Sequence, residues 1–211
     1  MNTINVSIEA RMTSSRLPGK VLKTICGKPT LELMIERVKQ ANYVSNIIVA
    51  TTTNDTDDPV VELCKKLNVQ YYRGSEDDVL KRVYLAHKEF QSDIVVELTG
   101  DCPLIEPLLI DHCITSFLLN DVDYVATSQC TTYPIGQAVQ VFSFNTLEYL
   151  NKNATTPEDR EHVSISIYQN PDQYRLMYID AMKKHHNPEL RITLDTQEDL
   201  EFIQNIYENL Y

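Results

Sequence analysis

Glycine is scarce in this sequence, with five residues among 211, and the scarcity excludes two common nucleotide-binding loops. No Gly-x-Gly-x-x-Gly run occurs, so a dinucleotide-binding fold has no support. A Walker phosphate loop is excluded too, because Gly19-Lys20 is followed by Val21 and position 14 is a serine. A phosphate site in this chain must therefore be built in another way.

Positive charge, long apolar runs and paired cysteines are also sparse. The net charge of −11 argues against non-specific binding to nucleic acid or to an anionic membrane surface. No stretch approaches the roughly 20 apolar residues of a membrane span, and the N-terminus lacks the features of a signal peptide. The cysteines are Cys26, Cys64, Cys102, Cys113 and Cys130, and no two of them form a Cys-x-x-Cys pair. We therefore expect reduced, mostly buried thiols in a cytoplasmic protein.

The positive charge that is present gathers in one loop near the start, residues 9–20. An alternating apolar run over residues 4–8 predicts a strand just before this loop. Pro18-Gly19 predicts a turn, and the loop carries three cations, Arg11, Arg16 and Lys20. A loop at the carboxyl end of a strand is where an open α/β sheet binds ligands, and fixed cations suit a polyphosphate. The alternative interpretation is a solvated basic loop.

The hydrophobic pattern alternates between strands and helices. Continuous apolar runs predict buried strands, three- and four-residue spacings predict helices, and Asp57, Asp58 and Ser75 are candidate helix caps. Strands are predicted at 4–8, 46–52, 69–72, 93–98, 122–127, 138–144, 174–179 and 190–194, and helices at 30–41, 57–67, 75–90, 107–120, 157–169 and 196–210, with one more ending at 151. This alternation is typical of a layered α/β sheet. We expect one domain, 1–211, with a smaller lobe at about 128–182.

A carboxylate follows the predicted strand at 93–98. Asp101 stands beside Gly100 at the end of that strand, where it could hold Mg²⁺ against a bound triphosphate. An aspartate in an ordinary turn is the alternative. The neighbouring Cys102 is a poor nucleophile candidate, because acidic neighbours raise a thiol pKa. Near the C-terminus, Thr196 and Asp199 have the spacing of a capping box, and Asp195 lies one residue outside it, at the end of the predicted strand 190–194.

The run Ala10-Arg11-x-x-Ser14-x-Arg16-Leu17-Pro18-Gly19-Lys20 resembles the nucleotide-binding loop of the sugar-acid cytidylyltransferases, which include the CMP-sialic acid and CMP-Kdo synthetases. The likeness is strongest to the spore-coat polysaccharide biosynthesis branch of that family. Three further segments are similar to family motifs: Gly100–Pro103 to the metal-binding turn, Arg73–Arg82 to a nucleotide-pocket segment, and Arg160–Val163 to a motif of the spore-coat branch.

The resemblance implies a three-layer α/β/α, nucleotide-diphospho-sugar transferase-like (Rossmann-like) mixed sheet with a small dimerisation lobe. It implies a CTP-dependent enzyme that transfers CMP to a sugar acid or related anionic acceptor and releases pyrophosphate, with Mg²⁺ as cofactor and a homodimer as the assembly. The implied catalytic residues are Arg11, Lys20 and Asp101, and the implied metal ligands are Asp101 and Asp195. The implied nucleotide-binding residues are Ala10, Arg11, Ser14, Arg16, Lys20, Ser75, Asp78, Arg82, Thr99 and Asp101, and the acceptor-binding candidates are Gln137, Gln140 and His162.

The sequence departs from the family at one motif. Relatives tend to carry Gly-Leu-Asp-Val-Glu where this chain has Gly136-Gln137-Ala138-Val139-Gln140, so both acids are missing. Glu9 also replaces a commoner proline or glutamine. One hypothesis is a more anionic or differently hydroxylated acceptor, because negative charge is lost on the acceptor side. The competing hypothesis is weakened or lost activity.

Two other functions stay open from the sequence. A nucleotidyltransferase that joins another nucleotide to a sugar 1-phosphate would favour a Gly-x-Gly-Thr-Arg start, which is absent here. A non-catalytic nucleotide-binding homologue would account for the missing acids near Gly136. The presence of Arg11, Arg16, Lys20, Asp101 and Asp195 argues against that second alternative.

Overall fold

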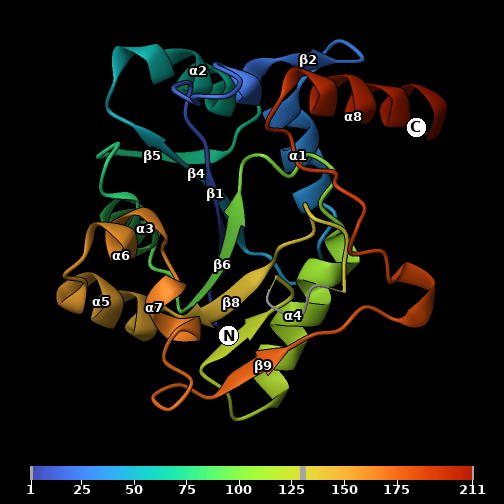
Figure 1. The fold of residues 1–211 in the computed structure, drawn as a ribbon. Coiled ribbons are helices and arrows are strands. Elements are labelled where there is room, and N and C mark those ends of the chain that lie inside the picture. The colour runs from blue at the N-terminus through green and yellow to red at the C-terminus, as the bar shows by residue number, and fades with distance from the viewer. Residues whose placement is uncertain (1, 129–131, 211) are drawn as a thin grey trace.

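The computed structural model describes residues 2–128 and 132–210, and a seven-stranded mixed sheet forms its centre (Figure 1). The strand order is β5-β4-β1-β6-β8-β7-β9. Four strands run parallel: β5 (Gln70–Gly74), β4 (Asn46–Thr52), β1 (Ile4–Glu9) and β6 (Ile94–Thr99). Beyond them, β8 (Gln140–Ser143) is antiparallel to β6 and to β7 (Tyr124–Ala126), and β9 (Leu176–Tyr178) is parallel to β7.

Helices cover both faces of this sheet, as the layered pattern predicts. On one face, α1 (Thr30–Val38), α2 (Asp58–Lys66) and α4 (Pro107–Leu119) pack their apolar side chains against the inward residues of β1 and β6. On the other face lie α3 (Val79–Glu89), α5 (Phe144–Asn153) and α7 (Ile165–Tyr168). The alternating apolar residues of β1 and β6 fill the first core, and Val95 of β6 points to the second, because successive strand residues point to opposite faces.

A third apolar cluster fastens the C-terminal helix to the rest of the domain. The helix α8 (Gln197–Leu210) packs against the short hairpin of β2 (Thr24–Ile25) and β3 (Lys28–Pro29), and its Tyr207 hydroxyl donates to the carbonyl of Pro103 at 2.9 Å. Short 3₁₀ turns lie at η1 (Lys20–Leu22), η2 (Asp55–Asp57) and η3 (Lys183–His185). Among residues 2–128 and 132–210, no helix has the length and apolar character needed to cross a membrane.

Most predicted elements are confirmed, some with shifted ends, but the predicted helix over 157–169 is wrong. The chain instead forms α6 (Pro157–Glu161), which begins with a capping box between Thr156 and Asp159, and then the separate α7. Between them His162 is extended, and the Ser164 hydroxyl donates to Gln140 on β8 at 2.5 Å. A tertiary contact thus turns the chain where the periodicity predicted one helix.

The predicted strand over 190–194 is also absent. Arg191 forms only an isolated bridge with Ile135, the amide of Ile192 donates to the carbonyl of Ile135 at 2.8 Å, and the amide of Leu194 donates to the carbonyl of Asp101 at 2.8 Å. The segment bonds in turn to two different parts of the chain, so no continuous ladder forms.

Of the predicted helix caps, Asp57 is the N-cap residue of α2, although its side chain makes no cap hydrogen bond, and Asp58 is the first residue of that helix. The predicted cap at Ser75 is wrong. The cap of α3 is Asp78, whose carboxylate accepts from the Lys81 amide at 3.0 Å, while Ser75 accepts from the Asp78 amide at 3.1 Å. The predicted lobe at about 128–182 contributes β8 and β9 to the central sheet, and its role in dimerisation stays a prediction.

Candidate active site

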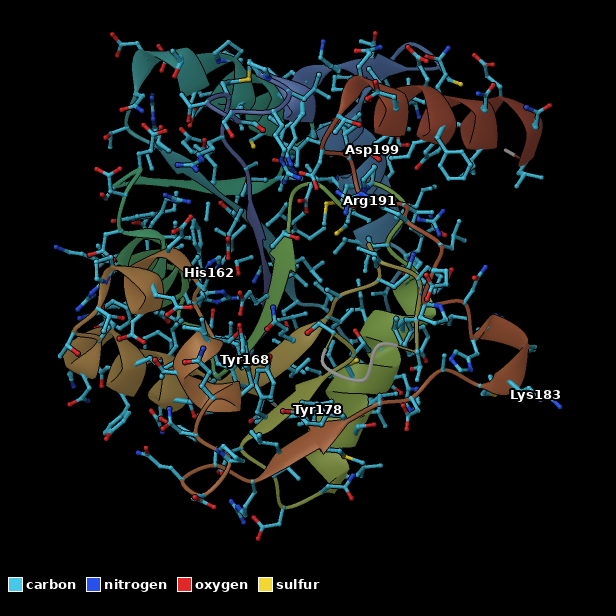
Figure 2. All side chains as sticks on the ribbon, viewed as in Figure 1. His162, Tyr168, Tyr178, Lys183, Arg191 and Asp199 are labelled. Atoms are coloured by element: carbon cyan, nitrogen blue, oxygen red, sulfur yellow. The ribbon has the colours of Figure 1, made fainter. Side chains whose placement is uncertain are left out.

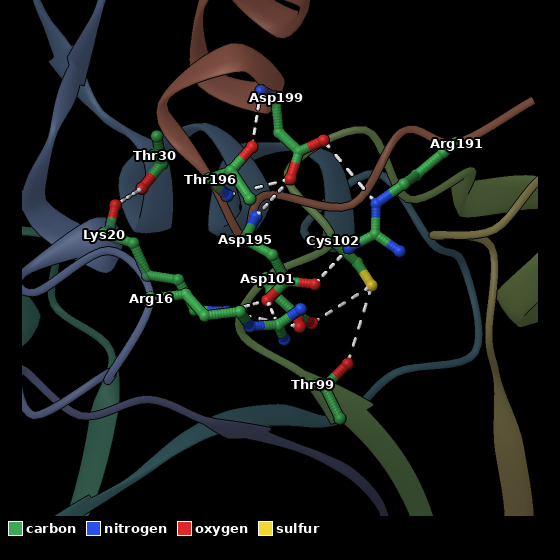
Figure 3. Close-up of polar contacts among 10 residues, drawn as sticks. All are labelled: Arg16, Lys20, Thr30, Thr99, Asp101, Cys102, Arg191, Asp195, Thr196 and Asp199. Atoms are coloured by element: carbon green, nitrogen blue, oxygen red, sulfur yellow. Dashed lines mark hydrogen bonds and ion pairs between the residues drawn. The ribbon is translucent and has the colours of Figure 1, made fainter.

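Four charged side chains from three remote parts of the chain meet at the carboxyl edge of the sheet (Figure 3). The Lys20 ammonium lies 2.8 Å from Asp195 Oδ1 and 3.4 Å from Asp101 Oδ2. Arg16 reaches the same Asp195 oxygen at 2.9 Å. The structure therefore brings together the two predicted metal ligands and two of the three predicted phosphate-binding cations.

The turn at Pro18-Gly19 directs Lys20 toward this cluster, as predicted. Gly19 has a φ of 70°, a backbone conformation that glycine adopts at little cost. Its amide donates to the carbonyl of Met12 at 2.8 Å, which closes the loop. The Thr30 hydroxyl at the start of α1 then donates to the carbonyl of Lys20 at 2.6 Å and anchors the far end.

Asp57 holds the near end of the same loop. Its Oδ1 accepts from the Met12 amide at 2.9 Å, and its Oδ2 accepts from the hydroxyls of Thr51 and Thr52 at 2.9 and 2.7 Å. Burial tends to raise the pKa of Asp57, but these hydrogen bonds outweigh it and lower the pKa below its usual value. Asp57 stands at the N-cap position of α2, but its side chain anchors the loop instead of bonding to the helix.

Asp101 is placed by the close approach of the loops that follow β1 and β6. The Gly100 amide donates to the carbonyl of Glu9 at 2.9 Å, and a Cβ at position 100 would lie 2.5 Å from that oxygen. Only glycine fits this contact without a backbone shift. The Cys102 thiol lies 3.5 Å from Asp101 Oδ1. Burial, together with the charge of Asp101, raises the pKa of that thiol, which agrees with the prediction that Cys102 is no nucleophile.

Hydrogen bonds of the residues before and after Asp195 in the sequence fix its position. The preceding Leu194 amide is bonded to the carbonyl of Asp101. On the other side, the predicted capping box is confirmed: Asp199 accepts from the amides of Thr196 and Asp195 at 2.9 and 2.8 Å, and Thr196 accepts from the Asp199 amide at 3.2 Å. Arg191 completes the arrangement through ion pairs with Asp195 and, at 3.5 Å, with Asp199 (Figures 2 and 3).

The cations keep Asp195 ionised although its side chain is only 8% exposed. Burial would raise its pKa, but the hydrogen bond from Lys20 and the charges of Lys20, Arg16 and Arg191 outweigh burial and lower it. Two carboxylates that share one ammonium group match the donors Mg²⁺ uses when it is bound through one or two carboxylates together with substrate phosphates. No group of three or more acidic, histidine or cysteine side chains forms an all-protein metal site in the described ranges. The residues present therefore fit a magnesium ion that is shared with a nucleotide.

Arg11 lies apart from the other two cations. Its guanidinium pairs with Glu76 at 3.3 Å, and it lines a cavity of about 520 Å³ together with residues 76–79 and Arg160. Asp78 lies in the same cavity, 3.6 Å from Arg160. Arg16 and Lys20 therefore lie together at the charged cluster and Arg11 does not, and the binding of phosphates by these cations stays a prediction.

The other predicted nucleotide-binding residues lie around these two places. Arg82 is buried and donates to the carbonyl of Glu76 at 3.3 Å and to that of Ser75. Ser75 is exposed before α3, and Thr99 ends β6 two residues before Asp101. Ala10 is buried in the core, and Ser14 is half-buried on the loop.

The acceptor-binding candidates are separated in the structure. Gln137 bonds through its side chain to the backbone of Leu104 and Glu106 and lines another cavity of about 700 Å³. Gln140 begins β8 at the carboxyl edge of the sheet. His162 is exposed at the end of α6 and lies away from Arg191 and Asp199 (Figure 2). Gln140 is thus the candidate that shares an edge with the charged cluster.

Sequence reasoning missed Arg191, Glu76 and Glu97. Arg191 stands four residues before Asp195, but that spacing brings side chains together only on a helix, and the segment is not helical, so the sequence offered no local signal for this pair. Glu97 interrupts a run of apolar residues in β6, where a buried strand would carry none. Cys26, Cys64, Cys102 and Cys113 are free thiols and all but Cys26 are buried, as predicted; Cys130 lies outside the described residues.

Comparisons with known proteins agree with this geometry. The sequence profile of the cytidylyltransferase family matches residues 6–211. The spore coat polysaccharide biosynthesis protein SpsF of Bacillus subtilis is 32% identical over 99% of this chain and 88% of its own, and a 3-deoxy-manno-octulosonate cytidylyltransferase of Geobacter metallireducens is 36% identical over 53% of this chain and 43% of its own. The solved structure of a cytidylyltransferase from Leptospira borgpetersenii superposes with a TM-score of 0.94 at 31% identity, over 100% of this chain and 89% of that one. Loop, fold and charged cluster together lead to one conclusion: the chain belongs to the cytidylyltransferase family.

Proposed function

We propose that this cytidylyltransferase transfers CMP from CTP to a sugar acid and releases pyrophosphate, in the synthesis of a surface polysaccharide. One observation carries the proposal: Lys20, Asp101 and Asp195, which are far apart in the sequence, converge at the sheet edge where α/β folds bind ligands. The names of the relatives that make spore-coat polysaccharide or act on an octulosonate support the acceptor class.

The chemistry needs positioning and charge neutralisation rather than a covalent intermediate on the protein. An oxygen of the acceptor attacks the α-phosphorus of CTP, the bond to the β-phosphate breaks, and pyrophosphate leaves. Lys20 and Arg16 would face the phosphates and stabilise the departing charge. Arg11, in the cavity beside Glu76 and Asp78, would contact the nucleoside part of CTP.

Asp101 and Asp195 would hold Mg²⁺, which neutralises phosphate charge when it is bound. Lys20 lies between these two carboxylates and offsets their mutual repulsion. Its ammonium group would also lie within reach of a phosphate oxygen of a nucleotide bound there.

The test is a steady-state assay of pyrophosphate release with CTP, magnesium and sugar acids, compared with UTP, GTP and ATP. Lys20→Ala and Asp101→Ala should each lower kcat/KM by about 10²-fold or more, the scale of losing one electrostatic stabiliser. Titration calorimetry should show that CTP binding depends on magnesium in the wild type and loses that dependence in Asp101→Ala.

Lys28→Ala is the matched control, because Lys28 is an exposed lysine that pairs with Glu36 at 2.6 Å outside the site. It should keep wild-type turnover. Near-wild-type turnover by Lys20→Ala, or preference for another nucleotide, would contradict the proposed function.

We further propose that the enzyme is a homodimer and that it works in the cytoplasm. The free thiols at Cys26, Cys64, Cys102 and Cys113 support a reducing compartment. Light scattering of the purified protein tests the dimer, and a monomer at micromolar concentration would contradict it.

A further inference from the structure

Polar side chains form a row across one face of the sheet beside the active site. Glu97 on β6 lies opposite Gln140 on β8, and Gln140 and Tyr178 both lie opposite Ala126 on β7. Residues directly opposite each other in a sheet point to the same face. Glu9 lies two residues beyond Ser7, which is the β1 partner of Glu97, so it points to that face as well. We call Glu9, Glu97, Gln140 and Tyr178 the polar row.

The polar row has more hydrogen-bond acceptors than donors. The Gln140 amide oxygen accepts from the Tyr124 and Ser164 hydroxyls, each at 2.5 Å. Ser164 also acts on the Glu97 carboxyl, but one hydroxyl has a single proton to donate. Among the described residues, Glu97 Oε2 and Glu9 Oε1 are buried without a hydrogen-bond partner. Such orphaned acceptors are costly unless a ligand or a proton satisfies them.

The row holds two buried carboxyl groups and no cation of its own. Burial raises the pKa of Glu9 to about 7, with Arg82 and Arg11 opposing the shift and Asp101 adding to it. Glu97 is only 5% exposed. Its burial and the charge of Glu9 raise its pKa, and the hydrogen bond from Ser164 opposes this shift without cancelling it. No cation of the described residues is among the groups that act on Glu97. Among the described residues, Glu97 therefore has no positively charged partner.

The row lies beside the active-site edge. Glu9 and Gln140 are half-buried, Tyr178 is 39% exposed, and Glu9 pairs in register with Thr99, two residues before Asp101. Burial raises the phenol pKa of Tyr168 on α7, and nearby Glu97 and Tyr178 raise that pKa further; Figure 2 shows Tyr168 beside α7 and Tyr178 on β9. Glu97 thus lies buried beside partly exposed side chains of the row, near the edge that carries Asp101.

We propose that Glu97, assisted by Glu9, is the subsite for a positively charged amino group on the sugar-acid acceptor. An ammonium group supplies three N–H donors and one positive charge, which are what the polar row lacks. The inference rests on the proposed function and names its acceptor class. It also reverses the expectation that the loss of acids at Ala138 and Gln140 removes negative charge from the acceptor side, because Glu97 places a carboxyl directly opposite Gln140.

The test compares sugar acids that differ only in an amino or a hydroxyl group at one carbon. The probes are 3-deoxy-manno-octulosonate with its 8-amino-3,8-dideoxy derivative, and equivalent pairs with the amine at other carbons. Titration calorimetry with a non-hydrolysable CTP analogue and magnesium should show at least one amine bound about tenfold or more tightly than its hydroxyl partner by the wild type. Glu97→Gln, which has nearly the same shape, should reduce that preference to less than about twofold and leave binding of the CTP analogue unchanged.

Glu89→Gln is the matched control, because it removes the same charge from the exposed end of α3, and it should keep the preference. Equal binding of every pair by the wild type, or an unchanged preference in Glu97→Gln, would overturn the inference and would mean that Glu9 and Glu97 only share a proton. A pyrophosphate-release assay run in parallel separates the two proposals. Turnover of hydroxyl acceptors without an amine preference contradicts this inference alone, whereas CTP binding without turnover of any acceptor contradicts the proposed function.

Discussion

Several individual residues combine burial with ionisable chemistry. Asp57 is fully buried and ionised because four neighbouring groups donate to it. His87 is also fully buried, and burial lowers its pKa to about 3, so it stays neutral while its Nδ1 lies 2.8 Å from the Ser92 hydroxyl. Glu9 differs from both, because burial raises its pKa to about 7. The free energy of unfolding therefore depends on pH in one direction through Glu9, whose pKa is raised, and in the other through Asp57 and His87, whose pKa values are lowered.

Glu9 should destabilise the fold as pH rises. Its folded pKa of about 7 lies above the usual 4.5, so the folded state binds more protons than the unfolded state between these values. The free energy of unfolding contributed by Glu9 is therefore full below pH 4.5 and falls as pH rises to 7. In Glu9→Gln this fall is absent. Between pH 5 and pH 8, the free energy of unfolding of the variant relative to that of the wild type should therefore rise by on the order of 1–3 kcal/mol, as measured by urea unfolding.

The comparison between variant and wild type is needed because His87 acts in the opposite direction. Its folded pKa lies below 6.5, so acid favours the unfolded state between pH 6.5 and 3 in both proteins, and this contribution cancels in the difference. A difference that stays constant from pH 5 to pH 8 would show that Glu9 is not held in a raised-pKa environment.

At the scale of elements, the segment from Arg191 to Asp195 depends on one loop for its position. Ile135 bridges to Arg191, and the next residue, Gly136, has a φ of 115°. A Cβ there would lie 2.9 Å from the backbone carbon of Ile192 and 3.0 Å from the Thr193 amide nitrogen. The absence of a side chain at this position lets the segment that leads to Asp195 lie against the loop.

Gly136→Ala should therefore damage both stability and the site. The positive φ costs about 1–2 kcal/mol for alanine, and the clash with backbone atoms must also push the 191–195 segment outward. We expect a loss of about 2 kcal/mol or more in urea unfolding. Magnesium-dependent CTP binding should weaken by about tenfold or more as Asp195 moves, which titration calorimetry measures.

Gly27→Ala is the control for backbone strain alone. Gly27 also has a positive φ, 79°, but a Cβ there would meet nothing within 4 Å. It should lose about 1 kcal/mol and keep CTP binding. Equal effects of the two substitutions on CTP binding would mean that contact with Ile192 does not position Asp195.

At the scale of the whole molecule, three apolar clusters hold the domain together, and the third one supports the active site from outside the sheet. Ile203 on α8 is fully buried in this cluster with Ile25 and Leu104. The same helix begins at the cap that holds Asp195. Packing far from the sheet thus determines where the second acid of the site lies (Figure 1).

Ile203→Ala should destabilise the protein by about 2–4 kcal/mol, the usual loss for a large-to-small change in a core. Because α8 carries the cap next to Asp195, magnesium-dependent CTP binding should weaken too. Its neighbour Phe202 is 43% exposed, so Phe202→Ala should cost less than about 1 kcal/mol and leave binding unchanged. If Ile203→Ala bound CTP as tightly as the wild type, α8 would not be part of the support of the site.

Most elements could be predicted because their signals lie close together in the chain. The strand at Asn46–Thr52 is a continuous apolar run and has the predicted ends. The errors arose where remote contacts decide the conformation: Ser164 bonds to Gln140 and interrupts a helical pattern, and the residues after Leu190 bond alternately to Ile135 and Asp101. Local periodicity contains no information about such partners.

The sequence by itself determined the α/β class, the turn that presents Lys20 and the family, because periodicity, turn residues and motifs are local properties of the chain. Only the tertiary structure decided that Lys20 meets Asp101 and Asp195, which are 81 and 175 residues away, and that Arg11 pairs with Glu76 instead. It also decided that Glu97 lies opposite Gln140, because strand register depends on packing across the whole sheet.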